Sequence, residues 1–145
     1  MLNIEPLFEQ IEYKDLDTGK EQEQWNFAKT ASTLADYGYV SFPVTADKHG
    51  PDMIAHHRKT CKNLNIQLKG SRPTLNKKYM GKDILISYVD RETNEICLYD
   101  HDEAVKLFEK TPSAQTVSWL EKGQYSGETF HKNKFNHIIK RLPIS

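Results

Sequence analysis

The sequence predicts an α/β fold in which helices flank a central mixed β-sheet. Apolar residues first recur at helical spacing in a segment that ends before Gly38. Short runs that alternate apolar and polar residues follow as far as Tyr99, and a second helical pattern begins directly after them. A chain of 145 residues, 37% of them hydrophobic, is expected to form one domain, residues 1–145, around a single core.

The first helix is expected over residues 21–37, with Gly38 as its C-terminal stop. Its apolar positions are Phe27, Ala28, Ala31, Leu34 and Ala35. Glu23 lies four residues before Phe27, so it is expected on the core-facing side of this helix. A glutamate in a first turn can also simply complement the helix dipole, and that alternative remains open for Glu23.

Five strands are expected after this helix, and turn residues separate them. The expected ranges are 39–44, 52–57, 64–69, 83–89 and 95–99. Residues 45–50 and 91–94 are expected to be turns, and Pro51 suits a strand entry because it cannot donate to a β-ladder. The first three strands are expected to form a meander behind the first helix.

Further helices are expected in the last third of the chain. Residues 102–110 read as a helix with Asp100 or Asp102 as N-cap, and a metal cluster over residues 101–103 is disfavoured because adjacent helical residues point different ways. Residues 113–120 read as a turn or short helix that ends by Gly123. Residues 129–142 carry apolar side chains near helical spacing and predict a C-terminal helix.

An acid, an amide and a lysine are expected to meet at the second and third strands. Asp52 stands at the edge of one strand, while Gln67 and Lys69 share a face of the next because side chains alternate with a period of two. Carboxylate and amide oxygens hold Mg²⁺ together with waters and substrate phosphate, and a neighbouring lysine can stabilise a phosphoryl transition state. The set suits phosphodiester hydrolysis, with an ordinary polar strand face as the alternative reading.

These residues resemble the core of the PD-(D/E)XK nuclease superfamily, and most nearly its small intron-encoded homing endonucleases and their uncharacterised bacterial relatives. The resemblance covers residues 21–125. It is carried by the segments 38–39, 51–52, 67–70, 79–82 and 99–103. It implies a restriction-endonuclease-like core and a metal-dependent endodeoxyribonuclease that uses Mg²⁺, with Mn²⁺ as a substitute.

The resemblance also implies roles for individual residues. Asp52, Gln67 and Lys69 match the catalytic positions, although Gln67 stands where most members carry an acid. Metal binding would therefore depend on Asp52, on Gln67 through its oxygen, and on an acid from the first helix. Glu23 is the expected helper and metal ligand, with Glu21 behind it.

Charge along the chain favours a nucleic-acid partner, although the net charge is zero. No acidic residue occurs between Asp52 and Asp83, while basic residues are frequent there. The expected nucleic-acid contacts are Arg58, Lys62, Arg72, Lys77, Lys78 and Lys82. A basic surface beside an acidic metal site suits a phosphodiester substrate, although any one of these lysines could serve solubility instead.

Duplex DNA is the expected substrate, and RNA remains open. Because one chain of this size offers one site, cutting both strands predicts a homodimer or homotetramer, with the residues near 119–125 and the C-terminal helix as the first candidates for its interface. The alternative function is a binding module that keeps the nuclease fold without turnover.

The remaining sequence features concern the cellular location of the protein and its two cysteines. No stretch approaches the roughly 20 apolar residues of a membrane span, and the N-terminus lacks a secretory pattern, so no membrane association and a cytoplasmic location are expected. Cys61 and Cys97 have no metal-ligand spacing. Cys97 is expected to pack within a strand, and Cys61 to be exposed.

Overall fold

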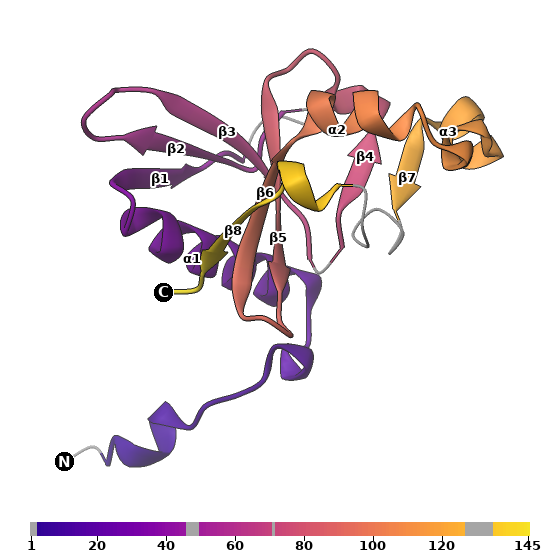
Figure 1. Cartoon of the computed structure of the whole chain (residues 1–145). Coiled ribbons are helices and arrows are strands. Elements are labelled where there is room, and N and C mark those ends of the chain that lie inside the picture. The colour runs from indigo at the N-terminus through magenta and orange to yellow at the C-terminus, as the bar shows by residue number, and fades with distance from the viewer. Residues whose placement is uncertain (1–2, 46–49, 71, 127–134) are drawn as a thin grey trace.

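The structure, a computed structural model, describes residues 3–45, 50–70, 72–126 and 135–145 (Figure 1). A six-stranded sheet has the order β1-β2-β3-β5-β6-β8, and a two-stranded sheet pairs β4 with β7. The large sheet contains β1 (Tyr39–Pro43), β2 (Met53–His57), β3 (Asn63–Leu68), β5 (Ile84–Asp90), β6 (Glu95–Asp100) and β8 (Lys140–Pro143). Strands β3 and β5 are parallel and the other pairs are antiparallel. The expected α/β class with a mixed sheet is confirmed.

Helix α1 spans Gly19–Ala35, so it begins and ends two residues earlier than expected. Its N-terminus carries a capping box. The Thr18 hydroxyl accepts a hydrogen bond from the Glu21 backbone N–H, and the Glu21 carboxylate accepts one from the Thr18 N–H. Gly38 has φ of +88°, which favours glycine and lets the chain turn from α1 into β1. Because Glu21 is occupied as a cap, Glu23 is the better candidate for a helix acid.

Apolar clusters lie on both faces of the large sheet. On one face, Leu34 of α1 packs with Met53, Ile66 and other strand residues. On the other face, Phe108 of α2 (His101–Phe108) belongs to a second cluster with residues of β5, β6 and α3 (Val117–Lys122). Of the five apolar positions expected to face the core in α1, Ala28 and Ala35 are instead exposed.

The parallel connection from β3 to β5 runs through β4 (Thr74–Asn76) and the 3₁₀ turn η3 (Lys77–Tyr79). β4 pairs with β7 (Gln124–Ser126), which lies far away in the sequence. Neither short strand was expected, because three residues are too few to show a periodic pattern. This crossover places the Tyr79 side chain within hydrogen-bond distance of Lys69, the residue that follows β3.

The C-terminal helix expected over residues 129–142 is wrong wherever the structure describes that segment, while residues 129–134 lie outside the described part. Residues Asn136–Ile138 form a 3₁₀ turn, η6, and β8 follows it. In β8, Leu142 pairs opposite Ile96 and is 5% exposed. Residues of β8 form backbone hydrogen bonds with the edge of β6, and these distant partners cannot be deduced from the local sequence pattern. This strand pairing outweighs the preference for a helix that the spacing of the apolar residues indicates.

Residues 113–120 form a turn and a short helix, namely the 3₁₀ turn η4 (Pro112–Gln115) followed by α3. Gly123 ends α3 with φ of +65°. Trp119 of α3 is 2% exposed and packs edge-on against Phe108, so this side chain is part of the core rather than a free interface residue. Cys97 is buried and Cys61 is exposed, as expected. In the described ranges no helix combines the length and apolarity needed to cross a membrane.

Candidate active site

Asp52 is held at the junction of the first three strands. It directly precedes β2; its N–H donates to the Ile66 carbonyl of β3, and its carbonyl accepts from Val44 after β1. Its Oδ2 atom accepts a hydrogen bond from Gln67 Nε2 at 2.8 Å and one from the Leu68 N–H at 2.9 Å. The acid and the amide that the sequence placed on neighbouring strands are therefore in direct contact.

Lys69 continues the line of β3 beyond its last residue. Its backbone N–H donates to the Ser87 carbonyl of β5, which fixes the direction of the side chain. Lys69 Nζ donates to the Tyr79 hydroxyl at 3.1 Å and lies 5.3 Å from the centre of that ring. One of the three ammonium donors is thus committed to a phenol from η3.

A cavity of about 800 Å³ connects the four residues expected at the site. Asp52, Gln67 and Lys69 line it from the strands, and Glu23 lines it from the first turns of α1. Glu23 is exposed, so it faces this cavity rather than the apolar core that its helical position suggested. The volume lies within the range of ligand pockets in proteins.

Burial disfavours both ions of this site. Loss of hydration raises the pKa of Asp52, and nearby Glu23 adds to this, while the Leu68 N–H, Lys69 and Gln67 oppose it. Burial likewise lowers the pKa of Lys69, and the attraction of Asp52 only partly offsets that effect. Both charged forms are therefore less favourable here than in water, and perturbed pKa values of this kind are common at functional sites.

The donor set fits a hard divalent cation. Gln67 donates through Nε2, which leaves its Oε1 atom as an acceptor beside the carboxylates of Asp52 and Glu23. Mg²⁺ commonly takes one or two carboxylates and keeps several waters, and Mn²⁺ accepts the same ligand types. Among the residues that the structure describes, no group of three or more His, Cys, Asp or Glu side chains is arranged to hold a metal. A cation here would consequently depend on water and on substrate oxygens for its remaining ligands.

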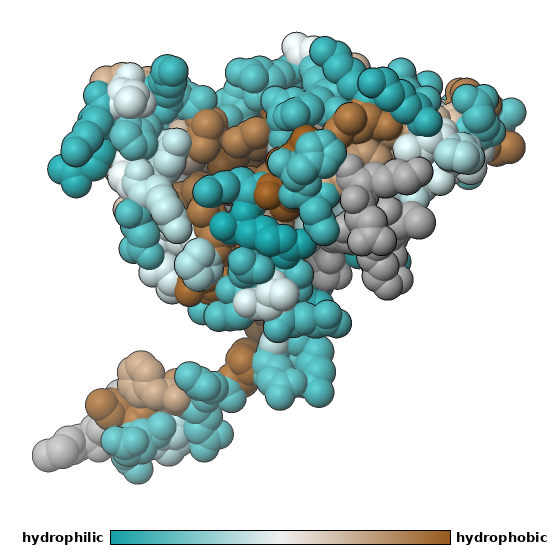
Figure 2. All heavy atoms as spheres, in the orientation of Figure 1, coloured by the Kyte–Doolittle hydropathy of each residue, from teal (hydrophilic) through white to brown (hydrophobic). Residues whose placement is uncertain are grey.

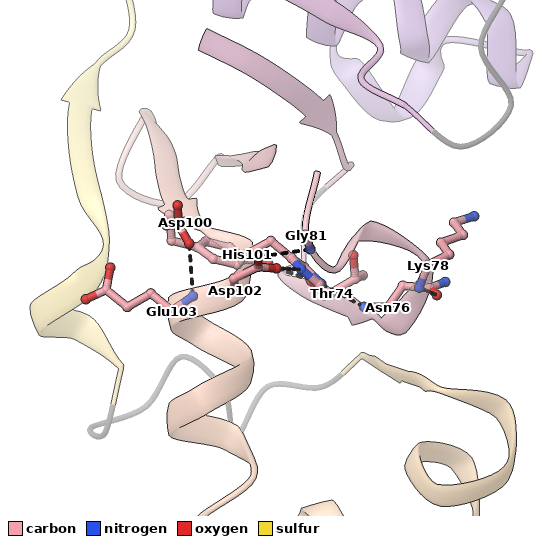
Figure 3. A network of polar contacts seen from close by, with 9 residues as sticks. Thr74, Asn76, Lys78, Gly81, Asp100, His101, Asp102 and Glu103 are labelled. Atoms are coloured by element: carbon pink, nitrogen blue, oxygen red, sulfur yellow. Dashed lines mark hydrogen bonds and ion pairs between the residues drawn. The ribbon is translucent and has the colours of Figure 1, made fainter. Parts of the chain in front are cut away.

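A polar network behind Tyr79 fixes the crossover that carries it (Figure 3). His101 is completely buried, and its Nε2 atom accepts a hydrogen bond from the Asn76 N–H at 3.0 Å. The ring proton is therefore on Nδ1, which lies 3.3 Å from Asp102 Oδ1. Asp102 Oδ2 accepts from the Gly81 N–H at 3.0 Å. Together these bonds tie both ends of the η3 turn to the start of α2.

The same network also contacts the Tyr79 side chain through the His101 ring. The Tyr79 ring packs edge-on against the His101 ring, with centroids 5.5 Å apart. Burial lowers the pKa of His101, although Asp102 partly opposes this, so the neutral ring is favoured. Asp100 Oδ1 accepts from the Glu103 N–H at 2.9 Å, which confirms the expected cap of α2. Residues 101–103 therefore serve structure, and Tyr79 links that structure to Lys69.

The expected nucleic-acid contacts divide into two groups. Lys77 and Lys78 lie on η3, Lys82 follows that turn, and Arg72 lies two residues after Gly70, which lines the cavity. All four are exposed, and the Lys78 side chain points away from the His101 network (Figure 3). In contrast, Arg58 and Lys62 lie in the β2–β3 turn, about 17 Å from Asp52 at the usual rise of a strand.

Tyr13, Asn26 and Tyr79 make polar contacts at the cavity or the site and were not singled out from the sequence. Tyr13 lines the cavity and packs against Trp25 of α1, and its hydroxyl accepts from Asn26 Nδ2. Only Tyr79 had a sequence signal, since it opens one of the segments that carry the family resemblance. Tyr13 lies in a segment without regular periodicity, so only the packed structure reveals its position.

Models of known protein families, curated protein sequences and solved structures were compared with this chain, and none matches.

Proposed function

We propose that this protein is a Mg²⁺-dependent endonuclease that hydrolyses phosphodiester bonds in duplex DNA, of the homing or restriction type. The observation that supports it best is the convergence of Asp52, Gln67 and Lys69, with Glu23 opposite, on one open cavity. Hard oxygen donors beside an ammonium group form the set that phosphodiester hydrolysis requires. The proposal includes a PD-(D/E)XK-type core as the origin of this arrangement.

Each residue has a role that its surroundings suit. Asp52, fixed by Gln67 and the Leu68 N–H, would hold the cation together with Gln67 Oε1 and Glu23. When bound, Mg²⁺ supplies Lewis-acid stabilisation of a phosphoryl oxygen and a water of lowered pKa. Lys69, oriented by Tyr79, would donate hydrogen bonds to the phosphate as negative charge develops on it.

The basic residues of the crossover between β3 and β5 would hold the DNA backbone. Arg72, Lys77, Lys78 and Lys82 are exposed on the crossover that also carries Tyr79. Contacts from lysine and arginine to phosphate carry most of the salt-dependent affinity for DNA without reading sequence. Binding that weakens steeply with salt, and that depends on these four residues more than on Arg58 and Lys62, is therefore expected.

A cleavage assay tests the proposal directly. Supercoiled and linear duplex DNA would be incubated with the wild type, Asp52→Asn, Lys69→Met and the control Lys62→Met, in Mg²⁺, Mn²⁺ or EDTA. Wild type and Lys62→Met should cut only with a divalent cation, while Lys69→Met should lose about 100- to 1,000-fold of the rate. Circular dichroism would verify folding. Full cleavage by both site variants would refute the site, and DNA left intact by the wild type would refute the activity.

A second candidate is a module that binds nucleic acid without cleaving it. The observation that favours it is the state of Asp52, whose Oδ2 atom already accepts two hydrogen bonds, beside a glutamine that brings no charge. This candidate predicts DNA binding that is the same with Mg²⁺ and EDTA. The nuclease proposal predicts instead that Mg²⁺ binding, followed by calorimetry in the absence of DNA, is lost in Asp52→Asn.

A further inference from the structure

An N-terminal arm, residues 3–12, extends away from the body of the protein (Figure 1). Every residue of this arm is exposed. The chain first packs at Tyr13, whose ring contacts Trp25 edge-on and lies 4.1 Å from the Arg91 guanidinium. The arm is thus anchored at its base and presents its side chains to solvent.

The arm has the pattern of an amphipathic helix. Its apolar residues are Ile4, Leu7, Phe8 and Ile11, which follow the spacing i, i+3, i+4, i+7 and are between 53% and 75% exposed. Acidic residues occupy the intervening positions Glu5, Glu9 and Glu12. A short 3₁₀ turn, η1 (Glu5–Phe8), already curls part of the segment. Such a stripe stabilises a helix only when a partner covers it.

An apolar groove of about 420 Å³ is open on the body of the molecule. Five leucines line it: Leu34, Leu64, Leu85, Leu98 and Leu142. Figure 2 shows hydrophobic atoms gathered between the β1–β3 lobe and the β6–β8 region, and a second hydrophobic group on the detached arm. The groove contains no residue of the Asp52 cavity, so it is a separate surface.

The rim of the groove complements the charge of the arm. Lys140 lines the groove, and Arg58 directly follows the lining residue His57 in the sequence. The single acid among the lining residues, Asp100, accepts a hydrogen bond as the cap of α2. An apolar stripe flanked by glutamates therefore matches an apolar groove flanked by basic groups.

We propose that the arm of one copy docks as a helix in the Leu64–Leu98 groove of a second copy, so that two chains exchange arms in a two-fold symmetric dimer. The same pair of surfaces is used twice in such a dimer, which closes it. The inference does not depend on nuclease activity, although a dimer would place two sites on one duplex.

Geometry favours a second copy over the arm's own groove. The anchor Tyr13 contacts Trp25 and Asn26, whereas the groove is lined by Leu34 and Tyr37 at the other end of α1. Eight or more helical residues separate these positions, which is about 12 Å or more. In Figure 1 the arm runs away from the body of the protein, and its N-terminal end lies apart from α1 and the strands.

Oligomeric state gives the first test, on the full chain by sedimentation over a wide concentration range. The wild type should dimerise, and Leu7→Asp with Phe8→Asp should weaken dimerisation at least about 100-fold, since two large apolar contacts are lost. Both positions are exposed in the single chain, so folding should be unaffected, and Val117→Asp, at an exposed site outside the groove, is the matched control. A monomeric wild type, or a dimer unchanged by the arm substitutions, would overturn the proposal.

Disulfide trapping gives the second test and distinguishes the two possible grooves. One chain would carry Phe8→Cys and another Tyr37→Cys, both with Cys61→Ser. Oxidation of the mixture should give a cross-linked dimer of the two chains, whereas replacing Tyr37→Cys by Val117→Cys should not. No cross-link in the mixture, with an internal disulfide in a chain that carries both substitutions, would show docking in the arm's own groove and overturn the proposal.

Discussion

Two polar clusters meet at Tyr79 and differ in how well the fold satisfies them. His101 is fully buried with a partner at each ring nitrogen, and the neutral ring it needs is the form that burial favours. Asp52 and Lys69 are half-buried beside an open cavity, and burial works against both of their charged forms. Burial thus favours the neutral form that the first cluster contains and disfavours the two charged forms of the second.

Tyr79 belongs to both clusters. The Tyr79 ring packs edge-on against the His101 ring, and the Tyr79 hydroxyl accepts a hydrogen bond from Lys69. Substitutions in the two clusters should therefore separate stability from activity, and substitutions at Tyr79 should affect both modestly.

Asp52→Asn should have the largest effect, and in opposite directions for activity and stability. Loss of the cation should lower single-turnover DNA cleavage by about 1,000-fold or more. Because the pKa of Asp52 is raised in the fold, its ionised form costs stability above pH 3.8; the amide variant should therefore be more stable than the wild type at pH 7. The advantage should vanish as pH falls below 3.8.

Chemical denaturation and cleavage rates measure the two effects of Asp52→Asn. Asp15→Asn, at an exposed position before α1, is the matched control and should change neither quantity. A variant that unfolds more easily than the wild type at pH 7 would contradict the assignment of Asp52 as a strained site acid.

His101→Leu should show the reverse behaviour. The substitution nearly preserves shape but leaves the Asn76 N–H without its acceptor, and it removes the contact to Asp102. We expect a loss of about 2 to 3 kcal/mol in the free energy of unfolding, because a buried unsatisfied group bears its full desolvation cost. The exposed His137→Leu is the control. Stability equal to the wild type would show that the network is not needed for the crossover.

Tyr79→Phe should have a smaller effect on both quantities. The ring contact with His101 is kept, and only the hydroxyl that orients Lys69 is lost. Cleavage should fall about 5- to 10-fold and stability by no more than about 1 kcal/mol, the typical net value of one hydrogen bond. The loss should appear in kcat rather than in DNA affinity. If Lys69→Met and the double variant Lys69→Met with Tyr79→Phe lose the same activity, Tyr79 acts through Lys69.

The smallest expected effect is a difference between the wild type and His101→Leu in how their free energy of unfolding changes with pH. The pKa of His101 is below 6.5 in the fold, so the unfolded chain binds more protons between the folded pKa and 6.5. Wild-type stability should therefore fall as pH drops below 6.5, with a contribution of at most about 1.4 kcal/mol per pH unit from this group. The slope should be shallower in His101→Leu. Equal slopes in both proteins would assign the acid sensitivity to other groups.

Much of the local structure was predictable because its causes are local. Alternation placed Gln67 and Lys69 on one face, and the apolar spacing with Gly38 defined α1. The position of Glu23 was only half predictable: its helical phase was correct, but the cavity that it faces in place of the core is formed with residues at the ends of β1 and β3. Tyr13 and Tyr79 reach the site from segments whose own patterns do not mark them for it.

The sequence by itself determined which side chains share a strand face and, to within about two residues, where the helices α1 and α2 begin. Each of these depends on dihedral preferences and side-chain periods over a few residues. Tertiary structure decided that residues 140–143 form β8, that His101 accepts a hydrogen bond from the start of the η3 turn, and that Lys69 donates one to Tyr79. These outcomes depend on hydrogen-bond partners and apolar surface from distant parts of the chain, which outweigh local preference when packing satisfies them.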